Sequence, residues 1–281
     1  MSRRRLGPLL VLGAALLWST GGVAIKALAE PALKVAFYRS ALAALALLLY
    51  FRPRLPRFTL PFVAGLISYA LCLVTFVVAT KWTTAANAIF LQYSGVIWVL
   101  LLSPIVVGEP LRARDGIAIG VALGGMGLFF VGKLRIGGAG DLIALSSGIF
   151  WAGLVLSLRR ERHGAAKAVV AYGNVLTAAA LFPFVAADLS LAPRSAAILV
   201  FLGVAQLAAA YVLFVRGLET VAAAQASLIG MAEPILNPVW VFLALGERPS
   251  AYALMGGAIV LGAIAWRTLS TPTPVVVPPP D

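Results

Sequence analysis

The chain has 281 residues, of which 62% are hydrophobic and 11% are charged, and its mean hydropathy is +1.00. A soluble domain carries roughly 25% charged residues, so this composition excludes an ordinary water-soluble globular protein. The net charge of +12 would also fit a nucleic-acid binder, but the cations gather at the ends of apolar segments, as they do in membrane proteins. We therefore expect membrane lipids, and no nucleic acid, among the partners of the chain.

Ten apolar segments follow one another along the chain, and most are close to the roughly 20 residues that cross a bilayer as a helix. The connections between them are short and leave no room for a soluble domain. Residues 269–281 are rich in proline, which predicts a disordered cytoplasmic tail. The predicted spans are 6–25, 33–51, 60–80, 84–106, 115–132, 141–158, 168–187, 195–215, 222–245 and 251–266.

The distribution of Lys and Arg predicts the orientation of these spans. With the N-terminus inside, 14 of the 22 cationic residues lie at cytoplasmic ends. The other eight are Lys26, Lys34, Arg39, Lys81, Lys133, Arg135, Arg194 and Arg248. Positive charge favours the cytoplasmic side, so we expect a multi-pass protein of the cell (inner) membrane with both termini in the cytoplasm. Arg39, about two turns into the second span, is expected to snorkel to the outer surface.

The two halves of the chain repeat each other. The fourth span ends in Gly108-Glu109 and the ninth in Gly246-Glu247, and both pairs are predicted to serve as helix ends and caps. The other aligned positions are Asn87 with Gln225, Gly95 with Glu233, Trp18 with Trp151, and Arg39 with Gly173. The alignment of Trp18 also favours a retained first span over a cleaved secretory signal.

A repeat of five spans has an odd number of helices, so the second copy enters the membrane from the opposite side. The halves are then related by a pseudo-two-fold axis in the membrane plane, an arrangement typical of transporters. We therefore predict an all-α integral membrane protein with ten transmembrane helices in two inverted five-helix repeats. The predicted repeats are residues 1–136 and 137–268.

Glu233 is the most unusual residue of the predicted spans. It lies about midway along the ninth span, is followed by Pro234, and has Asn237-Pro238 one turn later. The two prolines remove backbone donors and bend or break the helix, which frees carbonyl oxygens of the preceding turn. A buried carboxylate there could hold a substrate ammonium or a proton, or it could bond to the neighbouring backbone and only stabilise the kink. The residue types leave both interpretations open.

Polar and aromatic side chains within spans are the other candidates, because polar groups are costly in lipid and usually face the bundle interior. Asn87 and Gln225 either line a path or join helices, and aromatic rings either stack on bulky cargo or pack the bundle. Cys72, the single cysteine, is expected to be a small packing residue. The predicted substrate-binding set is Trp18, Tyr69, Asn87, Tyr93, Ser94, Trp98, Trp151, Gln206, Tyr211, Gln225, Glu233 and Asn237.

Together these features resemble the drug/metabolite transporter superfamily, and within it the EamA-type, ten-helix branch. The resemblance rests on the Leu17-Trp18-Ser19-Thr20 run, the fourth span from Asn87 to Trp98, the two Gly-Glu endings and the Glu233-Pro234 step, and it covers roughly residues 6–267. It implies export of small metabolites or amphiphilic compounds, with bacterial exporters of amino acids, including aromatic ones, as the nearest analogy.

Enzymes fit the residues poorly. Gly138 to Asp141 matches a GxGD string, but no mid-span aspartate pairs with it, and the single histidine, His163, lies in a basic loop. No GxxxxGK[ST] motif occurs, so a gradient must drive transport, and no cofactor or metal is expected.

The sequence therefore predicts a secondary transporter that exports amino acids, above all aromatic or large apolar ones, or other small amphiphilic metabolites across the cytoplasmic membrane by alternating access. A channel or an uptake permease for small metabolites is the alternative, and an intramembrane enzyme is a remote one. We expect a monomer whose partners are a small-molecule substrate and membrane lipids.

Overall fold

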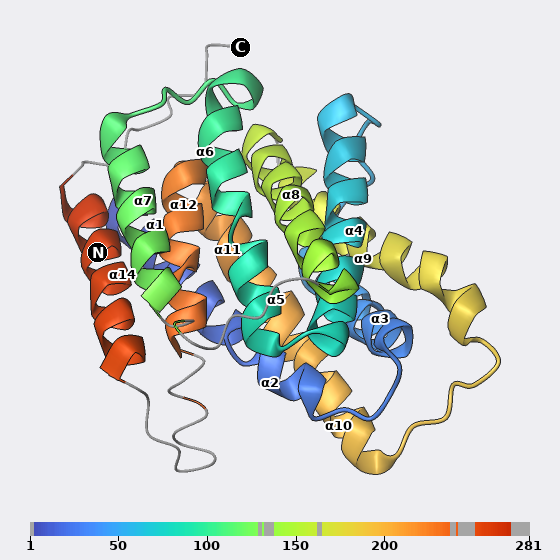
Figure 1. Ribbon diagram of the computed structural model, residues 1–281. Coiled ribbons are helices and arrows are strands. Elements are labelled where there is room, and N and C mark those ends of the chain that lie inside the picture. Colours follow the sequence, from blue (N-terminus) through green and yellow to red (C-terminus); the bar gives the residue numbers. More distant parts are fainter. Residues whose placement is uncertain are drawn as a thin grey trace.

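The computed structural model describes residues 3–128, 131, 138–161, 165–236, 240 and 251–270. Within these residues every regular element is a helix (Figure 1). The helices are α1 (Arg3–Trp18), α2 (Gly21–Lys26), α3 (Ala32–Phe51), α4 (Leu60–Trp82), α5 (Ala85–Gln92), α6 (Gly95–Val106), α7 (Ala113–Leu128), α8 (Ala139–Arg160), α9 (Ala165–Val185), α10 (Pro193–Val200), η1 (a π-helix, Phe201–Ala209), α11 (Ala210–Leu218), α12 (Ala223–Gly230) and α14 (Ala251–Leu269).

These helices confirm the predicted all-α membrane fold. The described residues contain seven segments long and apolar enough to cross a membrane, and each coincides with a predicted span. They are Leu6–Lys26, Ala32–Phe51, Leu60–Trp82, Asn87–Val106, Ala139–Arg160, Ala165–Val185 and Pro193–Leu218. The fifth predicted span coincides with the 16-residue α7, and the tenth with α14, which holds a shorter apolar stretch. The ninth span begins with α12, but its end, with Gly246 and Glu247, lies outside the described residues.

Three of the spans are interrupted. Between α1 and α2, the hydroxyls of Ser19 and Thr20 donate to the carbonyl oxygens of Leu16 (2.6 Å) and Leu17 (2.7 Å). Such back-bonding competes with the regular helix ladder and bends the chain. Turns at residues 93–94 and 231 separate α5 from α6 and α12 from the helical residues 232–236. The eighth span instead contains η1, a type of turn that is rare and often lies at functional sites.

Each main helix contact between the two repeats has an equivalent contact in which the repeats have swapped places. The second span packs against the seventh (α3 with α9), and the fifth against the tenth (α7 with α14). The third packs against the sixth (α4 with α8), and its equivalent, the eighth, packs against the first (α11 with α1). Figure 1 shows α7 beside α14 and α4 beside α8. This is the packing expected when a pseudo-two-fold axis relates two five-helix repeats.

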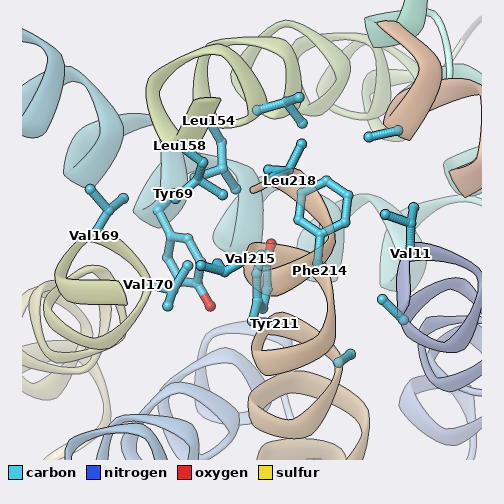
Figure 2. Close-up of a cluster of buried hydrophobic side chains, with 14 of the residues drawn as sticks. Val11, Tyr69, Leu154, Leu158, Val169, Val170, Tyr211, Phe214, Val215 and Leu218 are labelled. Atoms are coloured by element: carbon cyan, nitrogen blue, oxygen red, sulfur yellow. The ribbon is translucent and has the colours of Figure 1, made fainter. Parts of the chain in front are cut away.

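The buried core lies where the repeats meet. Figure 2 shows Tyr69 of α4 beside Tyr211 of α11, with Leu154 of α8 and Val170 of α9 around them, and all four side chains are buried. The ring centroids of the two tyrosines are 4.9 Å apart. Because lipid is as apolar as these side chains, the helices are held together mainly by close packing rather than by exclusion of water.

Candidate functional site

A cavity of about 50 Å³ lies between the two repeats. It is lined by Trp18, Arg39, Cys72, Leu73, Phe76, Gln92, Tyr93, Trp151, Gln206, Leu207, Tyr211 and Glu233. These residues come from both repeats, as expected for a transporter site on the pseudo-two-fold axis. The volume suffices for only a few water molecules, so any larger ligand requires the surrounding helices to move apart.

One wall of this cavity is aromatic. The ring of Trp18 meets Trp151 edge-on at 5.3 Å between centroids, and it meets Tyr211 at 5.2 Å and Phe214 at 5.1 Å. These separations are those of favourable aromatic pairs. Tyr69 packs behind the wall against Tyr211 and is fully buried. The cluster gives the cavity a wide apolar face.

Arg39 lies on the cavity, and the expectation that it snorkels to the outer surface is wrong. Its side chain is buried at 3% exposure, and Nη2 donates to Oε1 of Gln206 at 2.7 Å. Gln206 is itself fixed, because its Nε2 donates to the carbonyl oxygen of Trp18 at 3.2 Å. The physical reason is that η1 covers this part of α3: a Cβ on Gly203 would lie 3.0 Å from the Arg39 carbonyl oxygen. Five residues nearer the helix start, Lys34 is the cation that reaches the end of the bundle.

Glu233 faces the same cavity from the ninth span. It is 8% exposed, and its Oε2 accepts a hydrogen bond from the Tyr93 hydroxyl at 2.9 Å. The same hydroxyl lies 2.6 Å from the carbonyl oxygen of Gly230, so one proton is shared between two acceptors. Among the described residues no cation lies within 4 Å of the Glu233 carboxylate, although Arg39 lines the same cavity.

Six of the predicted site residues line the cavity, and the others are distributed around it. The six are Trp18, Tyr93, Trp151, Gln206, Tyr211 and Glu233. Tyr69 supports the wall, Ser94 lies at the break between α5 and α6 with its buried Oγ unpaired, and Trp98 is 44% exposed on the outside of the bundle. Asn237 lies outside the described residues.

Asn87 and Gln225 lie at opposite ends of the bundle. Asn87, at the start of α5, donates from Nδ2 to Oγ1 of Thr83 (3.3 Å) and to Oδ1 of Asp141 (3.4 Å). Gln225, at the start of α12, lines a separate vestibule at the other end. Inversion of the repeat explains the separation, because equivalent residues of inverted repeats enter the membrane from opposite sides.

The most consequential cavity residue absent from the predicted set is Arg39. Two features of the sequence point to Arg39. It lies deep in an apolar span, and the equivalent position of the second repeat is a glycine. Gln92 had a weaker signal as a polar residue in the fourth span, and its Nε2 lies 3.7 Å from Sγ of Cys72. Cys72, Leu73, Phe76 and Leu207 carried no signal, because apolar lining and apolar packing residues look alike in a sequence.

The vestibule, of about 1840 Å³, opens at the end of the bundle where α6 gives way to α7, the upper end in Figure 1. We call it the basic vestibule. Its charged lining consists of Arg52, Arg54, Arg57, Arg112, Arg159, Arg160, Lys167 and Arg267 with Glu109, Asp115, Glu161 and Glu219. Glu109 follows Gly108, which has a φ of +70°, and accepts bonds from Nε of Arg159 (2.6 Å) and from the backbone N–H of Ala223 (2.9 Å). It thereby caps α12.

The opposite end, near α2 and α10, is tied together by polar contacts, and we call it the closed end. Lys34 of the first repeat pairs with Asp188 of the second at 2.8 Å, and the Tyr38 hydroxyl donates to the Leu189 carbonyl oxygen at 2.6 Å. The hydrogen bond from Lys34 is the main reason that the pKa of Asp188 falls to about 2. The pKa of Glu30 is lowered as well, first by a hydrogen bond from Ser195. The two repeats are therefore joined across this end.

Comparison with known proteins agrees with this architecture. The sequence profile of the EamA-like transporter family matches the chain twice, over residues 5–131 and 138–269. An uncharacterized transporter of Archaeoglobus fulgidus is 27% identical over 200 residues, which cover 70% of this chain and 73% of that protein. A solved crystal structure superposes with a TM-score of 0.77 at 21% identity, covering 95% of this chain and 98% of the other, and supports the fold alone. The chain belongs to the EamA-like transporter family of the drug/metabolite transporter superfamily, and it is a multi-pass membrane transporter.

Proposed function

We propose that this transporter exports amino acids, above all those with aromatic or large apolar side chains, or other small amphiphilic metabolites. The observation that carries the proposal is the cavity between the repeats, where an aromatic wall adjoins two buried charges, Arg39 and Glu233. Apolar rings provide contact area for a bulky side chain, and a few placed polar groups fix the orientation of a ligand. A small molecule with one apolar and one charged end matches this arrangement.

Alternating access supplies the mechanism. The bundle has a wide vestibule at one end, and at the other end the Lys34–Asp188 and Tyr38–Leu189 contacts join the repeats. Because the helix packing of the repeats is equivalent, the two ends can exchange roles at little difference in energy. The small cavity volume supports a cycle in which the helices separate to admit the substrate and close around it.

The charge of the vestibule supports an orientation in the cell membrane. Eight Lys and Arg residues against four acids line it, and cationic loops favour the cytoplasmic side. We place the basic vestibule in the cytoplasm together with both termini, so substrate enters from the cytoplasm. A gradient of the substrate or of protons drives the cycle, and Glu233 is the acid on the cavity available for proton coupling.

Purified protein in liposomes tests this function. Liposomes loaded with labelled phenylalanine should lose label faster than protein-free liposomes, with and without an imposed pH gradient. Unlabelled tryptophan should compete better than alanine or serine. Absence of flux for every amino acid would exclude the export of amino acids, and equal competition by serine would exclude an aromatic-selective cavity.

A further inference from the structure

Arg39 is a buried cation whose hydrogen bonds are incomplete. It is 3% exposed, the structure gives its side chain one hydrogen bond, to Gln206, and its Nε–H has no partner. Burial of a guanidinium is costly unless a carboxylate and further hydrogen bonds compensate it. No carboxylate among the described residues lies within 4 Å of it. The guanidinium therefore carries a charge and an Nε–H that no described protein group satisfies.

Glu233 is the natural partner by charge, but it is held elsewhere. Its Oε2 accepts the hydrogen bond of Tyr93, and the cavity lined by both residues separates it from Arg39 beyond ion-pair distance. The two charges cancel over the cavity as a whole, yet neither satisfies the other directly. A ligand that brings a negative group to Arg39 and a positive group to Glu233 would give each side chain an ion-pair partner without adding net charge.

The position of the guanidinium is fixed before any ligand arrives. Gln206 bonds both to Arg39 and to the carbonyl oxygen of Trp18, at the break between α1 and α2. Gly21 leaves room for this amide, because a Cβ there would lie 2.5 Å from Nε2 of Gln206. A guanidinium held in this way is suited to a carboxylate, whose oxygens match its planar donors.

Building on the proposed function, we infer that Arg39 binds the carboxylate of the substrate and Glu233 its ammonium, while the Trp18 and Trp151 rings take its side chain. The substrate is then a zwitterionic amino acid, rather than an amphiphilic amine, an ester or a simple carboxylic acid. The alternative is that Arg39 is only a structural counter-charge. In that case its removal affects every ligand equally.

The inference is tested by binding of three matched probes to the purified full-length protein, measured from the dependence of the melting temperature on probe concentration. The probes are L-phenylalanine, L-phenylalaninamide, which lacks the carboxylate, and 3-phenylpropionate, which lacks the ammonium. We expect the wild type to bind phenylalanine about tenfold or more tightly than either of the others, as charge-assisted bonds are strong in a buried site.

Two variants assign each end of the ligand. Arg39→Gln should weaken phenylalanine binding about tenfold and leave phenylalaninamide within about twofold of its wild-type affinity. Glu233→Gln should weaken phenylalanine and spare 3-phenylpropionate. Arg194→Gln, which removes an exposed arginine of α10, is the matched control and should change none of the three. Arg39→Lys keeps the charge without the planar fork and should bind phenylalanine with intermediate affinity.

The outcomes separate this inference from the proposed function. Equal binding of phenylalanine and its amide by the wild type, or an equal loss for all probes in Arg39→Gln, would overturn the carboxylate site while leaving amino-acid export intact. Equal binding of phenylalanine and 3-phenylpropionate would remove Glu233 from the inference. If none of the probes binds the wild type and no amino acid is transported, the proposed function itself fails. If a variant does not fold, the wild-type selectivity still decides whether the ligand must carry both a carboxylate and an ammonium.

Discussion

Two helix crossings that the repeat makes equivalent have opposite chemistry. Where α3 crosses η1, Arg39 donates to Gln206 at the edge of the cavity. Where α9 crosses α4, Gly173 packs directly on Tyr69, whose nearest ring atom would lie 2.7 Å from an added Cβ. The following residue, Asn174, donates to the Tyr69 hydroxyl at 2.7 Å. One crossing thus presents a charge to the cavity, and the other is packed shut.

The same contrast recurs at Glu233. Its repeat equivalent is Gly95, where a Cβ would lie 2.3 Å from the carbonyl oxygen of Gly148, so α6 and α8 are in backbone contact. In the alignment of the repeats, each charged residue on the cavity therefore corresponds to a glycine: Arg39 to Gly173, and Glu233 to Gly95. Packing keeps the pseudo-symmetry on which the proposed alternating access depends, whereas the two charges on the cavity break it. A site with one cation and one anion can hold an amino acid in a single orientation.

The equivalence of these positions requires that the second repeat is inverted. Inversion predicts on which side of the membrane a fused reporter lies, so its activity is either present or absent. A periplasm-active reporter fused after Arg267 should be inactive, and a cytoplasm-active one should be active, because ten spans return the chain to the side on which it began. A fusion in the connection between α7 and α8, after Arg135, should give the reverse. Periplasmic activity after Arg267 would contradict the orientation, and activity of the same reporter at both positions would contradict the inverted repeat.

Adding a side chain at the close contact of α6 with α8 should be strongly destabilising. Gly95→Ala places a methyl group against the backbone of Gly148, where no flexible side chain can give way, so we expect a loss of about 2 kcal/mol or more in the free energy of unfolding. Gly120→Ala is the control, since nothing lies within 4 Å of its added Cβ. Thermal melting in detergent checks this. Similar melting temperatures for the two variants would show that α6 and α8 are not in close contact.

Two of the three tryptophans of the predicted set, Trp18 and Trp98, separate the cavity wall from the outer surface. Trp18→Phe trims a ring that contacts Trp151, Tyr211 and Phe214, and should lower phenylalanine transport several-fold, by about 1–2 kcal/mol of lost binding. Trp98→Phe, at a position 44% exposed, should leave transport near the wild-type rate. Equal rates in the liposome assay for the two variants would argue against the aromatic wall as a substrate contact.

Tyr93 tests whether Glu233 is held in place by its neighbour. Tyr93→Phe removes the hydroxyl that bonds to both Glu233 and the Gly230 carbonyl, and should lower the free energy of unfolding by about 1–2 kcal/mol. Tyr252→Phe, at an exposed position of α14, is the control for loss of a tyrosine hydroxyl. Unchanged stability of Tyr93→Phe would show that water replaces the hydroxyl and that Glu233 is not fixed by this bond.

The fold was predictable from the sequence because hydropathy and repetition act locally. All ten predicted spans coincide at least in part with helices, and Trp18 and Trp151, both in the predicted set, line the cavity together. The orientation of Arg39 was not predictable, because it depends on η1. A π-helical turn changes which side chains face a neighbour, and no periodicity in the sequence announces it. The separation of Asn87 from Gln225 follows from the inversion that the odd number of spans per repeat predicts.

Substitution at the closed end should have the smallest effect on stability. Solvent screens the Lys34–Asp188 ion pair, because the Asp188 side chain is 69% exposed. Its pKa is about 2 in the folded protein, below the ordinary 3.8, first because Lys34 donates to it and then because Ser190 does. A lowered folded pKa means that the carboxylate stabilises the fold above about pH 4 and that this contribution is lost as the pH falls towards 2. Asp188→Asn should therefore melt at most about 3 °C below the wild type at neutral pH. The difference should stay constant down to pH 5 and vanish on further acidification. A difference that is undiminished at pH 2 would show that the carboxylate charge is not what joins the repeats at this end.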